Sequence, residues 1–124
     1  MIPFDAQTSQ ALIDNMSYAV ICVDRDGIIN HWNKAAELML GFSASEALGQ
    51  HANLVIPTNM QHIHGPCFSK SQDTVKGFAL KKDVVLPFMH KSGLAVKMKG
   101  HATIIRDADG VPMGSAVIGS NANE

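Results

Sequence analysis

Three short turn sequences divide much of the chain into strand pairs, and they constrain its fold more than any other feature. Arg-Asp-Gly at 25–27, Lys-Ser-Gly at 91–93 and Asp-Ala-Asp-Gly at 107–110 each separate runs that are mostly apolar and rich in β-formers. Asp-Gly is a strong signal for a tight turn between antiparallel strands. The sequence therefore predicts a hairpin near its start and a three-stranded antiparallel meander near its end. The expected strands are 18–24, 28–32, 84–90, 94–106 and 112–120.

Helix signals fill the stretch between the two strand groups. Asn33 is a good cap for a helix over 34–40, because the segment consists of good helix formers and Gly41 can end it. Ser43 begins a second short helix, with Glu46 in the capping-box position and Gly49 as its stop. Before the hairpin, Thr8 or Ser9 is expected to cap a helix through about Met16. The segment 57–71 is helix-compatible but interrupted by Gly65-Pro66.

These elements predict an α+β fold, with a five-stranded antiparallel sheet and short helices on one face. The length of 124 residues suits one domain, and the 46% hydrophobic and 17% charged content is that of a globular protein. A net charge of -1 gives no bulk attraction to nucleic acid or an anionic membrane. Cys22 and Cys67 are expected to be reduced thiols, and neither a signal peptide nor a membrane span is evident, so we expect a cytoplasmic protein.

The order and spacing of several short motifs resemble a PAS domain over about residues 10–120. The motifs are YAVICVDRDGIINHWNKAAE at 18–37, MLGFSASEALGQ at 39–50, HKSG at 90–93 and IIRDADGVPMG at 104–114. The resemblance implies that residues 1–124 form a single PAS domain. PAS domains are sensory or interaction modules, are usually fused to an output domain, and many form dimers, so the resemblance also implies a homodimer.

A narrower resemblance links the chain to haem-binding PAS domains. Ile56-Pro57 is followed by His64, seven residues after the proline, and then by Phe68. In haem-PAS sensors of oxygen and CO, a histidine at this spacing is the proximal ligand of haem b, with an aromatic residue four positions later. The resemblance implies that His64 binds the iron. Those families often carry Arg where this chain has Gln61 and Val84, which favours CO, NO or a reactive small molecule over stably bound oxygen.

The strands after residue 83 offer an apolar surface for the distal side of a haem. Strand alternation places Val96, Met98, Gly100 and Ala102 on one face, and the glycine and alanine leave room for a flat macrocycle. Met98 is the candidate for a distal ligand or pocket wall, as in CO-responsive relatives. The remaining expected cofactor-binding residues are Val84, Leu86, Met89 and Lys82.

Several of these residues have competing interpretations. His62 is a rival ligand to His64, and the two together could instead form part of a metal site. Cys67 could bind iron as a thiolate or be a small buried hydrophobe, and Met98 could simply fill the core. Lys82, with its neighbour Lys81, could hold a haem propionate or an anionic ligand, or belong to a solvated loop.

Three functions remain open at the level of sequence. The first is a haem-based sensor module for a diatomic gas or for redox state, acting in signal transduction. The second is a stand-alone haem-PAS enzyme resembling N-nitroglycine lyase, in which Lys81, Lys82, Lys97 or His101 would contact an anionic substrate. The third is a haem-free PAS module that pairs with another protein or binds an apolar metabolite.

Overall fold

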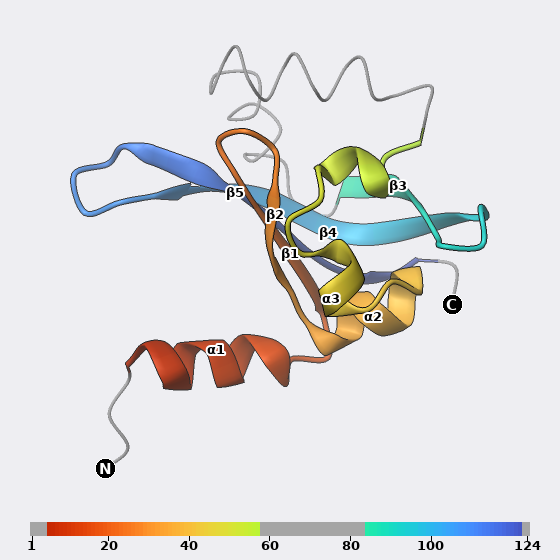
Figure 1. Ribbon diagram of the computed structural model, residues 1–124, viewed down its shortest axis with the longest axis horizontal. Helices are drawn as coiled ribbons and strands as arrows, with labels where there is room; N and C mark the ends of the chain where they lie inside the picture. Colours follow the sequence, from red (N-terminus) through yellow and green to blue (C-terminus); the bar gives the residue numbers. More distant parts are fainter. Residues whose placement is uncertain (1–4, 58–83, 123–124) are drawn as a thin grey trace.

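The computed structural model describes residues 5–57 and 84–122 (Figure 1). In this part of the chain a five-stranded antiparallel sheet is accompanied by short helices, as the sequence predicts. The elements are α1 (Ala6–Asp14), β1 (Ala19–Asp24), β2 (Ile29–Trp32), α2 (Lys34–Leu40), α3 (Ala44–Ala47), the 3-10 helix η1 (Ala52–Leu54), β3 (Val84–Met89), β4 (Ala95–Arg106) and β5 (Pro112–Asn121). None of the described helices has the length and apolar character needed to cross a bilayer.

The strands lie in the order β2-β1-β5-β4-β3, so the first and last strands of the chain are neighbours near the middle of the sheet. The predicted hairpin is β1 with β2, and the predicted meander is β3, β4 and β5. Pro87 lies in β3, which is an edge strand. A proline is tolerated there because an edge strand need not donate every amide to a neighbour.

The predicted caps of α2 and α3 are confirmed. The Asn33 side chain accepts a hydrogen bond from the Ala36 amide, and Gly41 ends α2 in the left-handed conformation with φ of 81°. Ser43 and Glu46 form both hydrogen bonds of the capping box. Leu48 is the C-cap of α3, and Gly49 follows it with φ of 85°.

The predicted start of α1 is wrong. Asp5 is the N-cap and accepts a hydrogen bond from the amide of Thr8, so the helix begins earlier and ends at Asp14 rather than near Met16. A carboxylate is a strong acceptor at the positive end of a helix, and it outcompetes the hydroxyl groups that follow it. The 3-10 helix η1 was not predicted, and the ring of His51 caps it by accepting from the Asn53 amide.

The core lies between the sheet and the helices α2 and α3, which cover the face here called the inner face (Figure 1). Burial alternates along the first half of β4, where Val96 and Met98 are buried and Lys97 and Lys99 are exposed. The predicted alternation on β4 is therefore confirmed. The buried cluster comprises Ala19, Ile21, Val23, Ile29, Trp32, Ala36, Leu40, Ala47, Val55, Leu86, Phe88, Val96 and Met98.

Candidate functional site

A row of small residues crosses the inner face of the sheet. Gly119 of β5 lies opposite Ala19 of β1 on one side and opposite Gly100 of β4 on the other. Gly100 in turn pairs with Val84 of β3. Directly paired residues project to the same face of a sheet. The three central strands therefore carry nothing larger than a methyl group along this row.

The two glycines are required because β4 and β5 approach closely. A Cβ atom at Gly100 would lie 1.9 Å from the carbonyl oxygen of Ile118, and one at Gly119 would lie 2.6 Å from the carbonyl oxygen of Lys99. Both contacts are with backbone atoms, which cannot move aside cheaply. The same Cβ at Gly119 would lie 2.9 Å from Cγ of Met98. The Met98 side chain therefore lies against Gly119, beside the glycine row.

Met98 forms one wall of this region. It is only 1% exposed and lies opposite Leu86 of β3 and Asn121 of β5. It belongs to the buried cluster together with Leu86 and Phe88. Among the residues predicted to contact a cofactor, the structure thus brings together Met98, Leu86, Gly100 and the backbone of Val84. A buried thioether in an apolar cluster suits both a pocket wall and ordinary core packing.

Met89 lies apart from this group. Leu86 and Phe88 are in the core, and alternation along β3 directs Met89 to the opposite face. Lys97 and His101 are exposed, and they alternate with the inward-facing residues of β4. Their side chains therefore leave from the face of the sheet opposite to that of Met98 and Gly100.

Next to the glycine row, the inner face is partly open and apolar. Ala102, Ile104 and Val117 are half-buried, and Val117 packs against the core cluster. A flat apolar group fits such a surface, because small side chains and backbone allow close contact over a wide area. The described part of the chain contains no group of three His, Cys, Asp or Glu side chains that could hold a metal ion. Met98 is the one soft ligand that the described residues of this region provide.

Nine residues named in the sequence analysis lie outside the described residues. They fall in the segment 58–83, and they include the expected iron ligand and its aromatic partner. They are Gln61, His62, His64, Gly65, Pro66, Cys67, Phe68, Lys81 and Lys82. Cys22 is described and has a free thiol, and burial raises its pKa.

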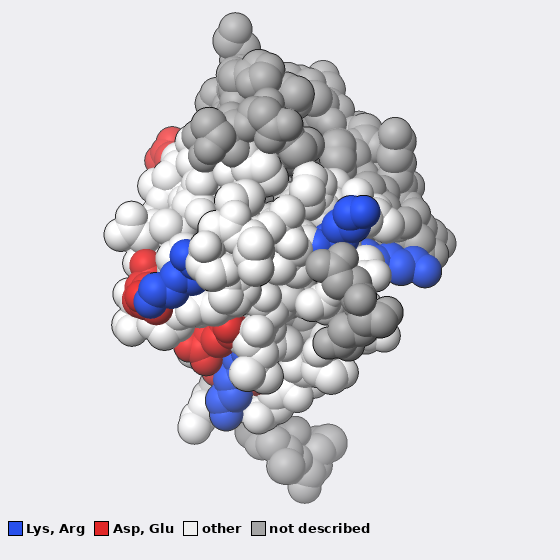
Figure 2. Space-filling model, turned by 90° about the vertical axis from the view of Figure 1, so that its right-hand side faces the viewer, with Lys and Arg blue, Asp and Glu red and all other residues white. Residues whose placement is uncertain are grey.

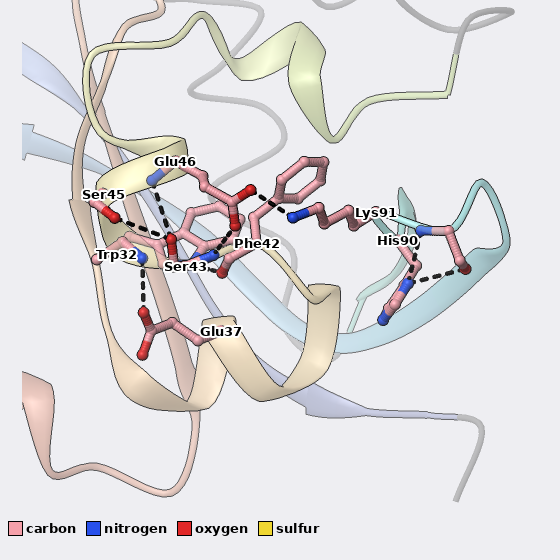
Figure 3. Close-up of polar contacts among 10 residues, drawn as sticks. Trp32, Glu37, Phe42, Ser43, Ser45, Glu46, His90 and Lys91 are labelled. Carbon is pink, nitrogen blue, oxygen red and sulfur yellow. Dashed lines mark hydrogen bonds and ion pairs between the residues drawn. The ribbon is translucent and has the colours of Figure 1, made fainter.

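A polar network, which the sequence analysis did not predict, ties the turn between β3 and β4 to the helices (Figure 3). Lys91 in this turn forms an ion pair with Glu46 of α3, and its amide donates to the carbonyl oxygen of Leu40 in α2. The hydrogen bonds from Lys91 and from the Ser43 amide lower the pKa of Glu46 to about 2. A further bond, from the Met89 amide to the Val55 carbonyl oxygen, joins β3 to the end of η1. These contacts hold one end of the β3–β4 hairpin against the helical layer.

The charged side chains visible in Figure 2 form small separate groups, some with both signs close together and others of a single sign. The Lys91 and Glu46 pair is one such group on the molecular surface, with both side chains about half exposed. The basic side chains Lys97 and Lys99 are exposed on the outer face of β4. Lys97 and Lys99 thus leave β4 from the face opposite to that of Val96 and Met98.

One curated relative matches about half of the chain. Over 65 residues the chain is 31% identical to the sensor protein FixL of Bradyrhizobium diazoefficiens. The aligned region covers 52% of this chain and 13% of the relative. The chain thus spans about an eighth of the length of that protein.

Solved structures and a family model agree on the fold. The chain is similar to the PAS domain of a Colwellia psychrerythraea protein, with a TM-score of 0.74, 22% identity and coverage of 94% and 97% of the two chains. It is also similar to the PAS domain of the RpfR quorum-sensing receptor of Cronobacter turicensis in complex with C12:0, with a TM-score of 0.65, 13% identity and coverage of 89% and 98%. The model for the PAS fold matches residues 9–120, and the chain belongs to this family.

Proposed function

We propose that this chain is a haem b-binding PAS sensor module in which His64 binds the iron. The proposal rests on the spacing of Ile56-Pro57, His64 and Phe68, together with the 31% identity to the sensor protein FixL. The apolar glycine row supports it, because a porphyrin needs a wide surface without large or charged side chains. The input is a diatomic gas, CO, NO or O2, or the redox state of the iron.

The residues of the proposed haem site have distinct roles. His64 is the axial ligand, and Phe68 is the aromatic residue that follows it. Leu86, Met98 and Gly100 form the apolar surface on the distal side, with Met98 as a wall or sixth ligand. When bound, haem supplies an iron that takes up a diatomic ligand, and the apolar surface governs how strongly that ligand is held.

Residues 1–124 act as a single PAS domain, in the cytoplasm and as a homodimer, and Lys82 contacts a haem propionate. The shift caused by ligand binding passes to a partner through elements at the edge of the domain. Transfer of the signal to a partner is consistent with the relative FixL, in which the matched region is 13% of a much longer sensor protein.

A second candidate is a haem-free module for an apolar metabolite. The observation that favours it is the same half-buried apolar surface around Ala102 and Val117, which would also accept an aliphatic ligand. The similar PAS domain of RpfR was solved in complex with C12:0. The enzyme hypothesis has lost the support it drew from Lys97 and His101, since both face away from this surface.

Absorption spectroscopy separates these functions. The purified chain should show a Soret band, or should develop one on titration with hemin at a ratio near one per chain. His64→Ala should lose the band, and the matched control His62→Ala should keep it. A colourless chain that takes up no hemin contradicts the haem proposal and leaves the apolar-metabolite module. A band that survives His64→Ala but not His62→Ala would move the ligand to His62.

A further inference from the structure

Helix α1 contacts other elements of the described structure through its last turn. None of its residues is buried, and Leu12 near its end is 54% exposed. Figure 1 shows the helix lying to one side of the sheet, with its last turn directed toward the start of β1. Two side-chain contacts hold this last turn. Asn33 donates a hydrogen bond to the Ile13 carbonyl oxygen at 2.8 Å, and the Asp14 carboxylate lies near the ring of His31.

The contact between His31 and Asp14 is incomplete when the imidazole is neutral. Nε2 of His31 lies 3.7 Å from Oδ1 of Asp14, which is too far for a hydrogen bond but within the range of an ion pair. The same nitrogen atom is buried and lacks a hydrogen-bond partner among the described residues. A neutral imidazole leaves this polar atom unsatisfied, whereas a protonated one places a positive charge against the carboxylate.

The position of Asp14 on the helix increases the difference between the two states. Asp14 is the last residue of α1, where the helix dipole is negative, and the last turn contains no basic residue. A carboxylate at that end of a helix is unfavourable, and a nearby cation offsets the penalty. The protonated ring of His31 supplies that cation from the adjacent strand β2.

The neighbouring groups do not supply an alternative charge. Cys22 of β1 pairs with His31 across the hairpin, and burial raises the pKa of its thiol, so it stays neutral through the range in which imidazole titrates. Lys34 at the start of α2 is exposed and forms no ion pair with Asp14 within 4.0 Å. His31 is the one cationic partner that Asp14 has among the described residues.

We propose that His31 and Asp14 form a proton-controlled latch that holds the last turn of α1 against β2. With His31 protonated, the ion pair and the Asn33 hydrogen bond act together. With His31 neutral, the hydrogen bond from Asn33 to Ile13 is the one of these two contacts that remains. The latch acts on the amino-terminal helix and is independent of whether the inner face binds haem.

Hydrogen exchange read by NMR tests the latch. The amide of Asn15 donates to the carbonyl oxygen of Ala11 and so reports on the last turn of α1. After correction for intrinsic exchange, its protection in the wild type should be roughly two- to five-fold higher at about pH 5.5 than at about pH 8. Asp14→Asn and His31→Gln should each remove this pH dependence. His101→Gln, which changes an exposed histidine on β4, should behave as the wild type.

Two results would overturn the proposal. One is wild-type protection that is equal at the two pH values. The other is Asp14→Asn protein that keeps the full pH dependence, which would place the titrating contact elsewhere. Asp14 is partly exposed, so Asp14→Asn gives an answer even where His31→Gln disturbs the hairpin. Trp32 fluorescence checks that each variant is folded, because the indole is buried in the core.

Discussion

Gly100 and Gly119 lie directly opposite each other on β4 and β5, and each occupies a place where a Cβ atom would strike the neighbouring backbone. The pair brings the two strands together and also clears the inner face of side chains. One feature thus serves both the fold and the candidate site. Its two consequences can be tested separately, since a change at either glycine affects stability, whereas a change at half-buried Ala102 alters the surface next to the row.

We expect Gly100→Ala to destabilise the fold by about 1–3 kcal/mol, because the added methyl group would lie 1.9 Å from a backbone oxygen in the absence of adjustment. Gly110→Ala is the matched control. Nothing lies within 4 Å of a Cβ there, but φ is +82°, so the cost should be the backbone strain of about 1 kcal/mol alone. Urea denaturation followed by Trp32 fluorescence measures both. If Gly100→Ala and Gly110→Ala lowered the free energy of unfolding equally, β4 and β5 would be able to move apart to accommodate the methyl group at little cost.

Asn33 should be one of the most sensitive polar positions in the described structure. It is 1% exposed, its oxygen accepts from the amides of Val20 and Ala36, and its nitrogen donates to the carbonyl oxygens of Ile13 and Tyr18. Removing all four bonds with Asn33→Ala should cost about 2–4 kcal/mol, since each buried bond contributes about 1 kcal/mol and unpaired partners remain.

The variant Asn33→Asp separates the two halves of this residue's role. Ionised aspartate still accepts from the Val20 and Ala36 amides but cannot donate to the two carbonyl oxygens. We expect faster hydrogen exchange in α1 and a loss of stability at least as large as in Asn33→Ala, because the buried carboxylate would face the carbonyl oxygens of Ile13 and Tyr18. Asn30→Ala, at an exposed position of β2, should change stability by less than about 0.5 kcal/mol. An Asn33→Asp variant as stable as the wild type would show that the two bonds donated by Asn33 contribute little.

The ion pair of Glu46 with Lys91 predicts a loss of stability in acid. Lys91 and the Ser43 amide lower the pKa of Glu46 from 4.5 to about 2 in the folded protein, so the unfolded chain binds a proton first as pH falls. The stabilisation is therefore fully present above the unfolded pKa and is lost between about pH 5 and pH 2. Thermal unfolding of the wild type and of Glu46→Gln should converge over this range. If the difference in unfolding temperature between the two proteins stays constant as pH falls, Glu46 does not contribute to the loss of stability in acid.

Screening provides an independent check on the same pair. Both side chains are partly exposed, so salt should weaken their attraction. At neutral pH the difference in unfolding temperature between the wild type and Lys91→Met should shrink as sodium chloride is added. The neighbouring hydrogen bond from the Lys91 amide to Leu40 is a backbone contact and survives the substitution. If the difference in unfolding temperature does not change with salt, the lower stability of Lys91→Met comes from altered packing and not from loss of the ion pair.

The fold was largely predictable because its signals are local. Asn33, Gly41 and the Ser43–Glu46 capping box specify the ends of α2 and α3 through hydrogen bonds within a few residues. The start of α1 was missed because Asp5 precedes two other plausible caps, and sequence alone does not rank them. The network from Lys91 to Glu46 was also missed. Its partners are separated by 45 positions, so only the three-dimensional fold brings them together.

The candidate site was predictable in its sheet half for a similar reason. Alternation along β4 depends only on the two-residue period of a strand, so it placed Met98 and Gly100 on the inner face. Alternation applied separately to β3 would also have placed Met89 on the face opposite to that of Leu86 and Phe88. The facing of Gly100 with Gly119 depends on the register between two strands, which no local signal reports.

The last prediction tests whether the inner face beside the glycine row is a binding surface. Ala102 is half-buried and faces inward, whereas its neighbour Thr103 is exposed on the outer face. Ala102→Phe should fill the surface and weaken hemin binding by about tenfold or more, since blocking contact over a porphyrin face removes apolar burial worth more than about 1.4 kcal/mol. Thr103→Phe adds the same ring to the other face and should bind hemin as the wild type does. Titrations followed at the Soret band measure both affinities. Equal binding by the two variants would place the ligand away from β4.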